Sequence, residues 1–226
     1  MMRNMNIRAA LRKLECKLTG KCTKKGAWHL ELSEPTSKRR IAELEKKIGV
    51  RFPEVIREFI SVHGELFSLS WEAKESLLEQ LPDYMEELVG GYFDFDVKNL
   101  VFDFDGWKFP DVPYSIEDKS QVLNASNLFP FIDLMNGDRL VVVTEGEFWG
   151  QVFYLNHEGS RTIDFRLSEN VEQLMQILVQ LAFPDLECWM IKCFHDSDLD
   201  RLSLDLKSSQ LWRKILDTTD VGKVPC

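Results

Sequence analysis

Apolar residues recur at helical spacing between residues 38 and 48. They fall on every third or fourth position, which places them on one face of a helix with 3.6 residues per turn. Gly49 follows directly, and glycine adopts the left-handed conformation after a helix C-terminus at the least cost. The pattern therefore predicts an amphipathic helix over 38–48. The positions on its apolar face are Ile41, Leu44 and Ile48.

A second amphipathic helix is predicted over residues 54–62. Pro53 suits the first helical position, because a backbone N–H there would have no partner within the helix. Gly64 is placed to end the helix. The two predicted helices are joined by a short corner that contains Phe52 and Pro53. The apolar face of the second helix comprises Val55, Ile56, Phe59 and Ile60.

β-Branched and aromatic runs separated by turn residues dominate the chain from residue 92 to residue 165, which favours strands. Asn136, Gly137 and Asp138 have the composition of a tight hairpin turn, whose central positions need positive φ. Strands that are close in sequence and joined by turns favour antiparallel pairing. The predicted strands are 92–96, 100–105, 128–133, 139–144, 151–155 and 161–165.

A third helix is predicted over 170–182, and Ser168 or Asn170 is placed to cap its N-terminus. Its apolar stripe comprises Val171, Leu174, Met175, Leu178 and Leu181. The expected fold class is therefore α+β, with helices packed on a twisted antiparallel sheet of about five or six strands. The residues expected to be buried together are Leu44, Ile48, Phe52, Ile56, Phe59, Val142, Phe153, Leu174 and Leu178.

Three segments are predicted along the chain: a basic N-terminal leader over 1–35, a main domain over 36–183, and a helical C-terminal extension over 184–226. Within the main domain, the acidic stretch over 71–88 is predicted to be helical in part, with Pro82 breaking or restarting the helix. The leader is predicted to contain a short helix. Its apolar positions are Ile7, Leu11, Leu14 and Leu18.

Charge is unevenly distributed along this chain of net charge −9. Residues 1–40 carry a net charge of +8, residues 41–226 carry −17, and residues 65–118 alone carry −11. An acidic body repels phosphates, so direct nucleic-acid binding is not expected. It attracts basic proteins and raises their association rate. The leader is either an arm for an acidic partner or membrane surface, or a helix docked on the protein's own acidic body; the second interpretation is preferred, because it needs no partner.

The sequence contains no motif for a catalytic nucleophile, a phosphate-binding loop or a catalytic metal. Its five cysteines form no dense framework, which fits reduced thiols in a cytosol. The cysteines and histidines lack the spacing of common zinc sites, and no cofactor is expected. No apolar run approaches the ~18 residues of a membrane span, and the N-terminus lacks the apolar core of a secretory signal. A non-enzymatic cytoplasmic protein is therefore expected.

The order of these features resembles the SUKH superfamily over roughly residues 36–183. The features are a Glu-rich helix, glycine, an apolar-Pro corner and a second helix, followed by a Gly-Asp turn, a strand, a Val-aromatic-Tyr strand and His-Glu. That superfamily joins bacterial toxin-immunity proteins, fungal cell-wall-assembly regulators and Syd-like proteins. Phe52 and His63 stand where the family often has Leu and Asn, which leaves the subfamily open. The resemblance implies a domain that binds proteins.

Aromatic and acidic residues alternate between Tyr92 and Trp107, so each strand there has one aromatic and one carboxylate face. If the two strands pair, four carboxylates share a face, and such a cluster suits a cation because like charges destabilise a sheet. The face is a protein-binding surface, a solvated surface without a role, or a divalent-metal site, although Asp-x-Asp lacks the ligand spacing of a calcium loop. The candidate partner-binding residues are Asp94, Asp96, Asp103, Asp105, Trp107, Asp83, Glu86 and Glu87.

The expected function combines the resemblance with this acidic surface. By resemblance, the chain is an immunity protein that binds a cognate toxin and blocks its active site. The expected toxin is a basic, nuclease-type domain, and binding is steric and electrostatic, with no catalytic residue, metal or cofactor. The alternative is a regulatory scaffold that is not linked to a toxin, as in the fungal members, with the terminal segments as further contact surfaces.

Overall fold

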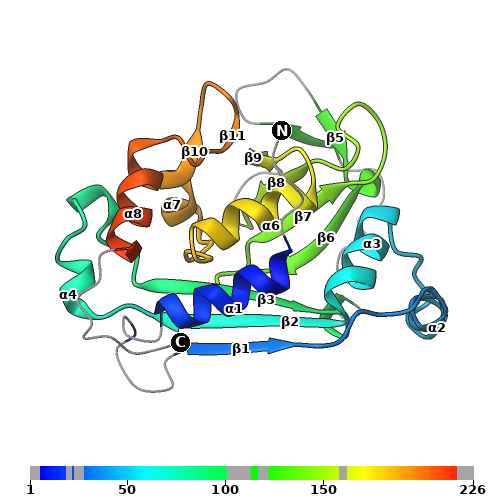
Figure 1. Ribbon diagram of the computed structural model, residues 1–226. Coiled ribbons are helices and arrows are strands. Elements are labelled where there is room, and N and C mark those ends of the chain that lie inside the picture. Colours follow the sequence, from blue (N-terminus) through cyan, green and yellow to red (C-terminus); the bar gives the residue numbers. More distant parts are fainter. Residues whose placement is uncertain are drawn as a thin grey trace. The chain divides into compact units, whose positions relative to one another are not determined.

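The computed structural model describes residues 6–18, 22, 28–100, 113–116, 122–157 and 162–217 (Figure 1). The chain forms two compact units, and each is assembled from separate stretches of sequence. Unit 1 contains Met1–Leu30, Ser68–Phe93 and Met175–Cys226, and unit 2 contains Glu31–Phe67 and Asp94–Leu174.

Unit 2 begins with the two helices that the sequence predicts, α2 (Lys38–Ile48) and α3 (Glu54–His63). Ser37 caps α2, because its side-chain oxygen accepts a hydrogen bond from a backbone N–H of the first turn at 3.3 Å. Gly49 ends α2 in the left-handed conformation, with a φ of 79°. α3 begins at residue 54, as expected, and Pro53 is its N-cap residue rather than its first helical residue. Both helix predictions are confirmed.

One glutamate fixes the corner between these helices. Oε1 of Glu45 accepts a hydrogen bond from the backbone N–H of Phe52 at 2.9 Å and lies 3.4 Å from Nε of Arg57 on α3. The ring of Phe52 is buried and meets Phe129 edge to face, with 6.2 Å between the ring centroids. The corner is thereby held to both helices and to the strand that carries Phe129.

α3 ends at Gly64, whose φ of 96° and ψ of −174° are open to almost no residue except glycine. A Cβ at this position would lie 2.1 Å from Oγ of Ser33 and 2.6 Å from the carbonyl oxygen of Glu34. Ser33 is itself held, because its Oγ accepts a hydrogen bond from the backbone N–H of Leu66 at 2.9 Å. Conformation and space both require glycine here.

We expect Gly64→Ala to lower the free energy of unfolding by about 1–3 kcal/mol more than Gly49→Ala does. Both substitutions place a Cβ on a residue with positive φ, but a Cβ at Gly49 has no atom within 4 Å. Urea denaturation of the two variants beside the wild type measures the difference. Equal losses would show that the Ser33 segment moves aside without cost.

A six-stranded sheet with the strand order β5-β4-β9-β8-β7-β6 forms most of the rest of unit 2 (Figure 1). Strands β6 to β9 pair antiparallel with their sequence neighbours, as predicted, and β5 pairs antiparallel with β4. The pair β4–β9 is parallel, which departs from the predicted pattern. The α+β class is confirmed. The strands are β4 (Pro113–Ile116), β5 (Val122–Asn124), β6 (Leu128–Asp133), β7 (Arg139–Val143), β8 (Val152–Leu155) and β9 (Thr162–Ser168).

The predicted hairpin turn joins β6 to β7. Gly137 has a φ of 91°, as a tight turn of this composition requires. Asp133 and Arg139 face each other at the start of the ladder, and Nε of Arg139 lies 2.7 Å from Oδ1 of Asp133. The turn and this ion pair set the register of the hairpin.

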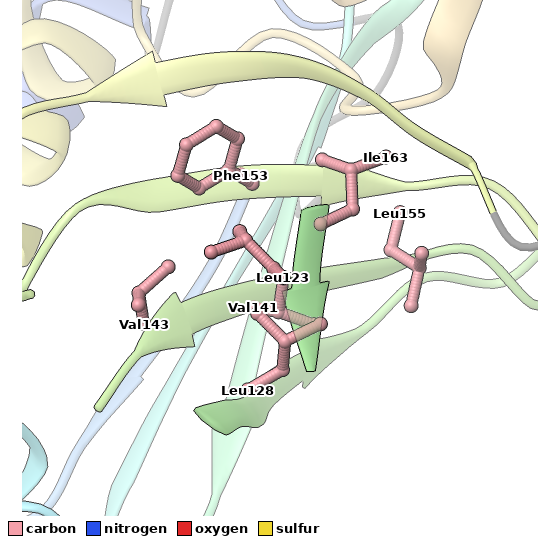
Figure 2. Close-up of a cluster of buried hydrophobic side chains, with 7 residues drawn as sticks. All are labelled: Leu123, Leu128, Val141, Val143, Phe153, Leu155 and Ile163. Carbon is pink, nitrogen blue, oxygen red and sulfur yellow. The ribbon is translucent and has the colours of Figure 1, made fainter. Parts of the chain in front are cut away.

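Seven buried side chains from five strands form a cluster on this sheet (Figure 2). Cross-strand neighbours make the contacts: Val141 faces Phe153, and Leu155 faces Ile163. Of the nine residues expected in the core, Ile48 is half-buried and the others are buried. The members of the cluster are Leu123, Leu128, Val141, Val143, Phe153, Leu155 and Ile163.

A three-stranded sheet of order β1-β2-β3 contains β1 (Trp28–Leu32), β2 (Leu66–Glu72) and β3 (Gly90–Asp96). The sequence predicts β3 but neither β1, which lies in the expected leader, nor β2. The stretch over 71–88 is helical in part, as predicted, with α4 (Glu75–Leu78) before Pro82 and the 3₁₀ turn η1 (Asp83–Met85) after it. The division into the segments 1–35, 36–183 and 184–226 stays a prediction.

Two buried tryptophans organise the interior of unit 1. Trp71 and Trp212 stack with 6.0 Å between ring centroids, and their indole N–H groups donate to the carbonyl oxygens of Ala182 and Leu181, both at 2.7 Å. The helices of unit 1, including the helix that begins in unit 2, are α1 (Ile7–Leu18), α4, α6 (Val171–Gln180), α7 (Cys188–Ile191) and α8 (Lys207–Asp217).

The N-terminal helix α1 packs against α8. Its predicted apolar positions are buried, and Nζ of Lys17 lies 2.6 Å from Oδ1 of Asp217. Helix α1 therefore docks on α8, whereas docking on an acidic body of the protein stays a prediction. None of the helices in the described part of the chain is long and apolar enough to cross a membrane.

Candidate functional site

A pocket of about 220 Å³ lies in unit 1, between the segment 83–88 and the helical segment 189–193. We call it the acidic pocket, because three carboxylates belong to its lining. Its polar and aromatic lining residues are Asp83, Tyr84, Glu86, Glu87, Trp189 and Cys193.

The first wall is held in place by two buried apolar residues. Met85 and Leu88 are each 1% exposed, and the backbone between them is hydrogen-bonded from the Leu88 N–H to the Met85 carbonyl at 3.1 Å. Pro82, which has no N–H to donate, begins the turn and accepts a hydrogen bond from the Met85 N–H at 2.8 Å. Met85 and Leu88 point into the core, and the residues beside them in this turn are exposed. The exposed residues are Asp83, Tyr84, Glu86 and Glu87.

The second wall is formed by α7 and the 3₁₀ turn η3 (Lys192–Phe194). Ile191 and Phe194 are fully buried and anchor this wall, whereas Trp189 is 53% exposed. Trp189 lies on α7, which has only four residues, and its side chain faces solvent.

A cysteine links the two walls. The Cys193 thiol donates a hydrogen bond to the carbonyl oxygen of Tyr84 at 3.3 Å. Burial raises the pKa of the Cys193 thiol, and the nearby Glu87 carboxylate raises it further. The thiol therefore stays protonated at neutral pH, so it lacks the thiolate that a catalytic nucleophile requires.

No described residue neutralises the carboxylates of the acidic pocket. Among the described residues, Asp83, Glu86 and Glu87 form no ion pair, whereas Glu65 pairs with Arg40 at 2.8 Å. Tyr84, between these carboxylates, is 62% exposed. Exposed aromatic rings attract cationic side chains through cation–π contacts, and unpaired carboxylates beside them attract the same side chains by charge.

The structure describes part of the predicted acidic face on β3. Phe93 and Phe95 are buried, as the alternation predicts, and Asp94 and Asp96 between and after them are half-buried. Oδ1 of Asp96 accepts a hydrogen bond from the backbone N–H of Lys98 at 2.8 Å. The predicted strand over 100–105, with Asp103 and Asp105, and also Trp107 lie outside the described residues, so the four-carboxylate face stays a prediction.

A second polar cluster surrounds Asp138 in unit 2. Its carboxylate is 2% exposed and accepts hydrogen bonds from the Tyr154 hydroxyl, from Asn136 at 2.7 Å, and from the backbone and the ring Nδ1 of His157 at 2.9 and 2.7 Å. Burial raises the pKa of Asp138, but the hydrogen bonds outweigh burial and leave this pKa lowered. The cluster joins the β6–β7 turn to the end of β8, which is a structural role.

The described residues contain no group of three or more His, Cys, Asp or Glu side chains arranged to hold a metal ion. Asp103 and Asp105 of the predicted acidic face lie outside those residues, so the metal interpretation of that face stays a prediction.

A model of the SMI1 / KNR4 family (SUKH-1) matches residues 35–176. The chain belongs to this family. Within its SUKH-1 domain lie α2, α3 and the β6–β9 strands, which carry the motifs from which the resemblance was inferred. A search of curated proteins found no match.

Only part of the acidic-pocket lining lies within the residues that the SUKH-1 family model matches. Asp83 to Leu88 lie inside the matched residues, whereas Trp189, Met190 and Cys193 lie beyond residue 176. Sequence reasoning selected Asp83, Glu86 and Glu87 but missed the aromatic residues Tyr84 and Trp189. The sequence holds no local signal for the exposure of Trp189, because that exposure depends on tertiary packing.

Proposed function

We propose that this SUKH-1 protein binds a basic protein partner through the acidic pocket, in the manner of an immunity protein. The observation that carries the proposal is the meeting of three unpaired carboxylates with exposed Tyr84 and Trp189. Tyrosine and tryptophan dominate the binding energy of many protein interfaces. Complementary charge raises the association rate and selects the partner.

The proposed partner is a toxin domain of the nuclease type. Proteins that act on nucleic acids carry positive charge to attract phosphates, and the same charge is attracted to the acidic pocket. The proposed mechanism is occlusion: the bound SUKH-1 protein covers the active site of the toxin and performs no chemistry. Family membership supports this non-enzymatic role.

A regulatory scaffold is the second candidate function. The observation that favours it is that one wall of the acidic pocket comes from chain beyond the SUKH-1 match, so the pocket is not a property of the family domain alone. The identity of the binding partner distinguishes the immunity function from the scaffold function. A basic nuclease-type protein supports immunity, and a cellular enzyme or structural protein supports the scaffold.

The test begins with affinity capture from the native cell and mass spectrometry, followed by binding kinetics with the purified partner. The double variant Asp83→Lys, Glu87→Lys is expected to slow association about tenfold at low salt, and the loss is expected to shrink at high salt. The control, Glu34→Lys with Glu58→Lys, makes the same change of net charge at two exposed glutamates of unit 2. It is expected to retain a larger part of the wild-type rate.

Equal association rates for the two double variants would place the binding surface elsewhere. Reversal of Asp94 and Asp96 to lysine then tests the surface that the sequence predicts on β3, which Asp103, Asp105 and Trp107 would extend. Slower association in that variant, with the pocket variant unchanged, would move the proposed site to β3. Exposed charges contribute little to stability, so each pocket variant is expected to fold normally.

A further inference from the structure

An eight-residue loop connects β7 to β8 in unit 2, and we call residues 144–151 the Trp149 loop. Its two ends are tied together, because the Gly150 N–H donates to the Val143 carbonyl at 2.8 Å and the Val143 N–H donates to the Gln151 carbonyl at 3.0 Å. A further bond, from the Trp149 N–H to the Gly146 carbonyl at 3.2 Å, closes the tip. The backbone of the loop is therefore ordered before any partner binds.

Neighbouring aromatic residues in this loop point in different directions. Phe148 packs on the buried cluster of the sheet, and its ring meets Phe153 edge to face at 6.0 Å. Trp149, the next residue, is 62% exposed. Because Phe148 is held by the core and Gly150 has a left-handed φ of 82°, the backbone presents Trp149 outward.

Two exposed glutamates, Glu145 and Glu147, belong to the same loop as the indole. In the part of the chain that the structure describes, neither has an ion-pair partner. One cationic side chain contacts the loop: Arg166 donates a hydrogen bond to Oε1 of Gln151 at 3.2 Å, and it lies 3.1 Å from Glu169 in the described part of the chain. The charge of Arg166 is thus already balanced by Glu169, and the two loop carboxylates remain available.

We propose that the Trp149 loop is a second binding surface, which takes an arginine- or lysine-bearing segment of a protein. The indole face attracts a cationic side chain, most strongly a guanidinium, and the two carboxylates add attraction of the same sign. A preformed loop binds with little loss of backbone entropy. The inference rests on the loop alone and does not depend on the acidic pocket.

The test uses the full-length protein labelled with ¹⁵N and a hexa-arginine peptide as the probe, with hexa-glutamate of the same length as its control. The indole N–H signals of Trp149 and Trp189 are assigned from the variants Trp149→Phe and Trp189→Phe. Addition of hexa-arginine is expected to shift the Trp149 signal, and hexa-glutamate is expected to leave it in place. Met135→Ala, which removes an 84%-exposed side chain outside the loop, serves as the matched variant and is expected to bind unchanged.

The strength of the site is read from the backbone signal of Glu147. Its Kd for hexa-arginine is expected to rise about two- to fivefold in Trp149→Ala, which is the size of an exposed cation–π contact. A Trp149 signal that does not move at millimolar peptide, or an unchanged Kd in Trp149→Ala, would overturn the inference. Movement of the Trp189 signal without movement of the Trp149 signal would do so as well, while leaving the proposed function of the acidic pocket intact.

Discussion

Replacement of Phe59 by alanine is expected to lower the free energy of unfolding by about 3–5 kcal/mol. Phe59 is 5% exposed on α3, and its ring meets Phe95 of β3 at 4.8 Å and His63 at 4.7 Å. Truncation to alanine removes these contacts and leaves a cavity, because the backbone of α3 is held by its hydrogen bonds and cannot collapse into the space.

Urea denaturation followed by far-UV circular dichroism measures this loss. Val62→Ala is the matched control: it lies on the same helix, shortens an apolar side chain and is 56% exposed. The control is expected to change stability by about 0.5 kcal/mol or less. Equal unfolding midpoints for the Phe59 and Val62 variants would show that the buried face of α3 has been assigned to the wrong residues.

Replacement of Asp138 by alanine is the second large effect that we expect, at roughly 2–4 kcal/mol near neutral pH. The substitution removes the acceptor of the hydrogen bonds from Tyr154, Asn136 and His157. The Tyr154 side chain is fully buried, so its hydroxyl loses its partner away from water. Tyr154→Phe removes one bond and keeps the carboxylate, so it is expected to cost less.

Asp138 also gives the fold a predictable response to acid. Its pKa is lower in the folded chain than in the unfolded chain, so the unfolded chain takes up a proton first as pH falls. The stabilisation is complete above the unfolded pKa of about 4 and is lost as pH falls through the lowered folded pKa. Wild-type stability is therefore expected to drop between about pH 5 and pH 3 by more than that of Asp138→Asn, which has no proton to gain.

Urea unfolding midpoints of wild type and Asp138→Asn, measured across this pH range, give the fall in stability of each protein. Parallel curves would show that the Asp138 carboxylate does not titrate with unfolding, and that its hydrogen bonds contribute equally in both protonation states.

Local signals made the helices predictable. Gly49 and Pro53 mark helix ends that depend only on neighbouring residues, so the sequence predicts the bounds of α2 and α3 to within about a residue. The sequence does not predict β2, because this strand is defined by partner strands that are distant in sequence. β4 was missed for the same reason: it pairs with β9, nearly 50 residues further on.

The sequence predicts the first wall of the acidic pocket but not the second. The carboxylates of the first wall stand out in the sequence, because they lie in the acidic stretch that favours a basic partner. The second wall is joined to them only by tertiary packing, through contacts such as that between Cys193 and Tyr84 across more than 100 residues. No local sequence pattern predicts that Trp189 is exposed to solvent, since an apolar residue near a short helix is more often buried.

The Trp71 ring is exposed during synthesis of the chain, because its stacking partner Trp212 is made much later. The two rings are separated by most of the sequence, and α8, which supplies Trp212, leaves the ribosome late. At about 5–20 residues per second, Trp212 follows β2 by about 7 to 28 seconds, and the Trp71 ring lacks its partner ring for that time. During that interval an apolar indole and the strand that carries it are open to chaperones and to other nascent chains, so efficient production depends on what reaches that surface first.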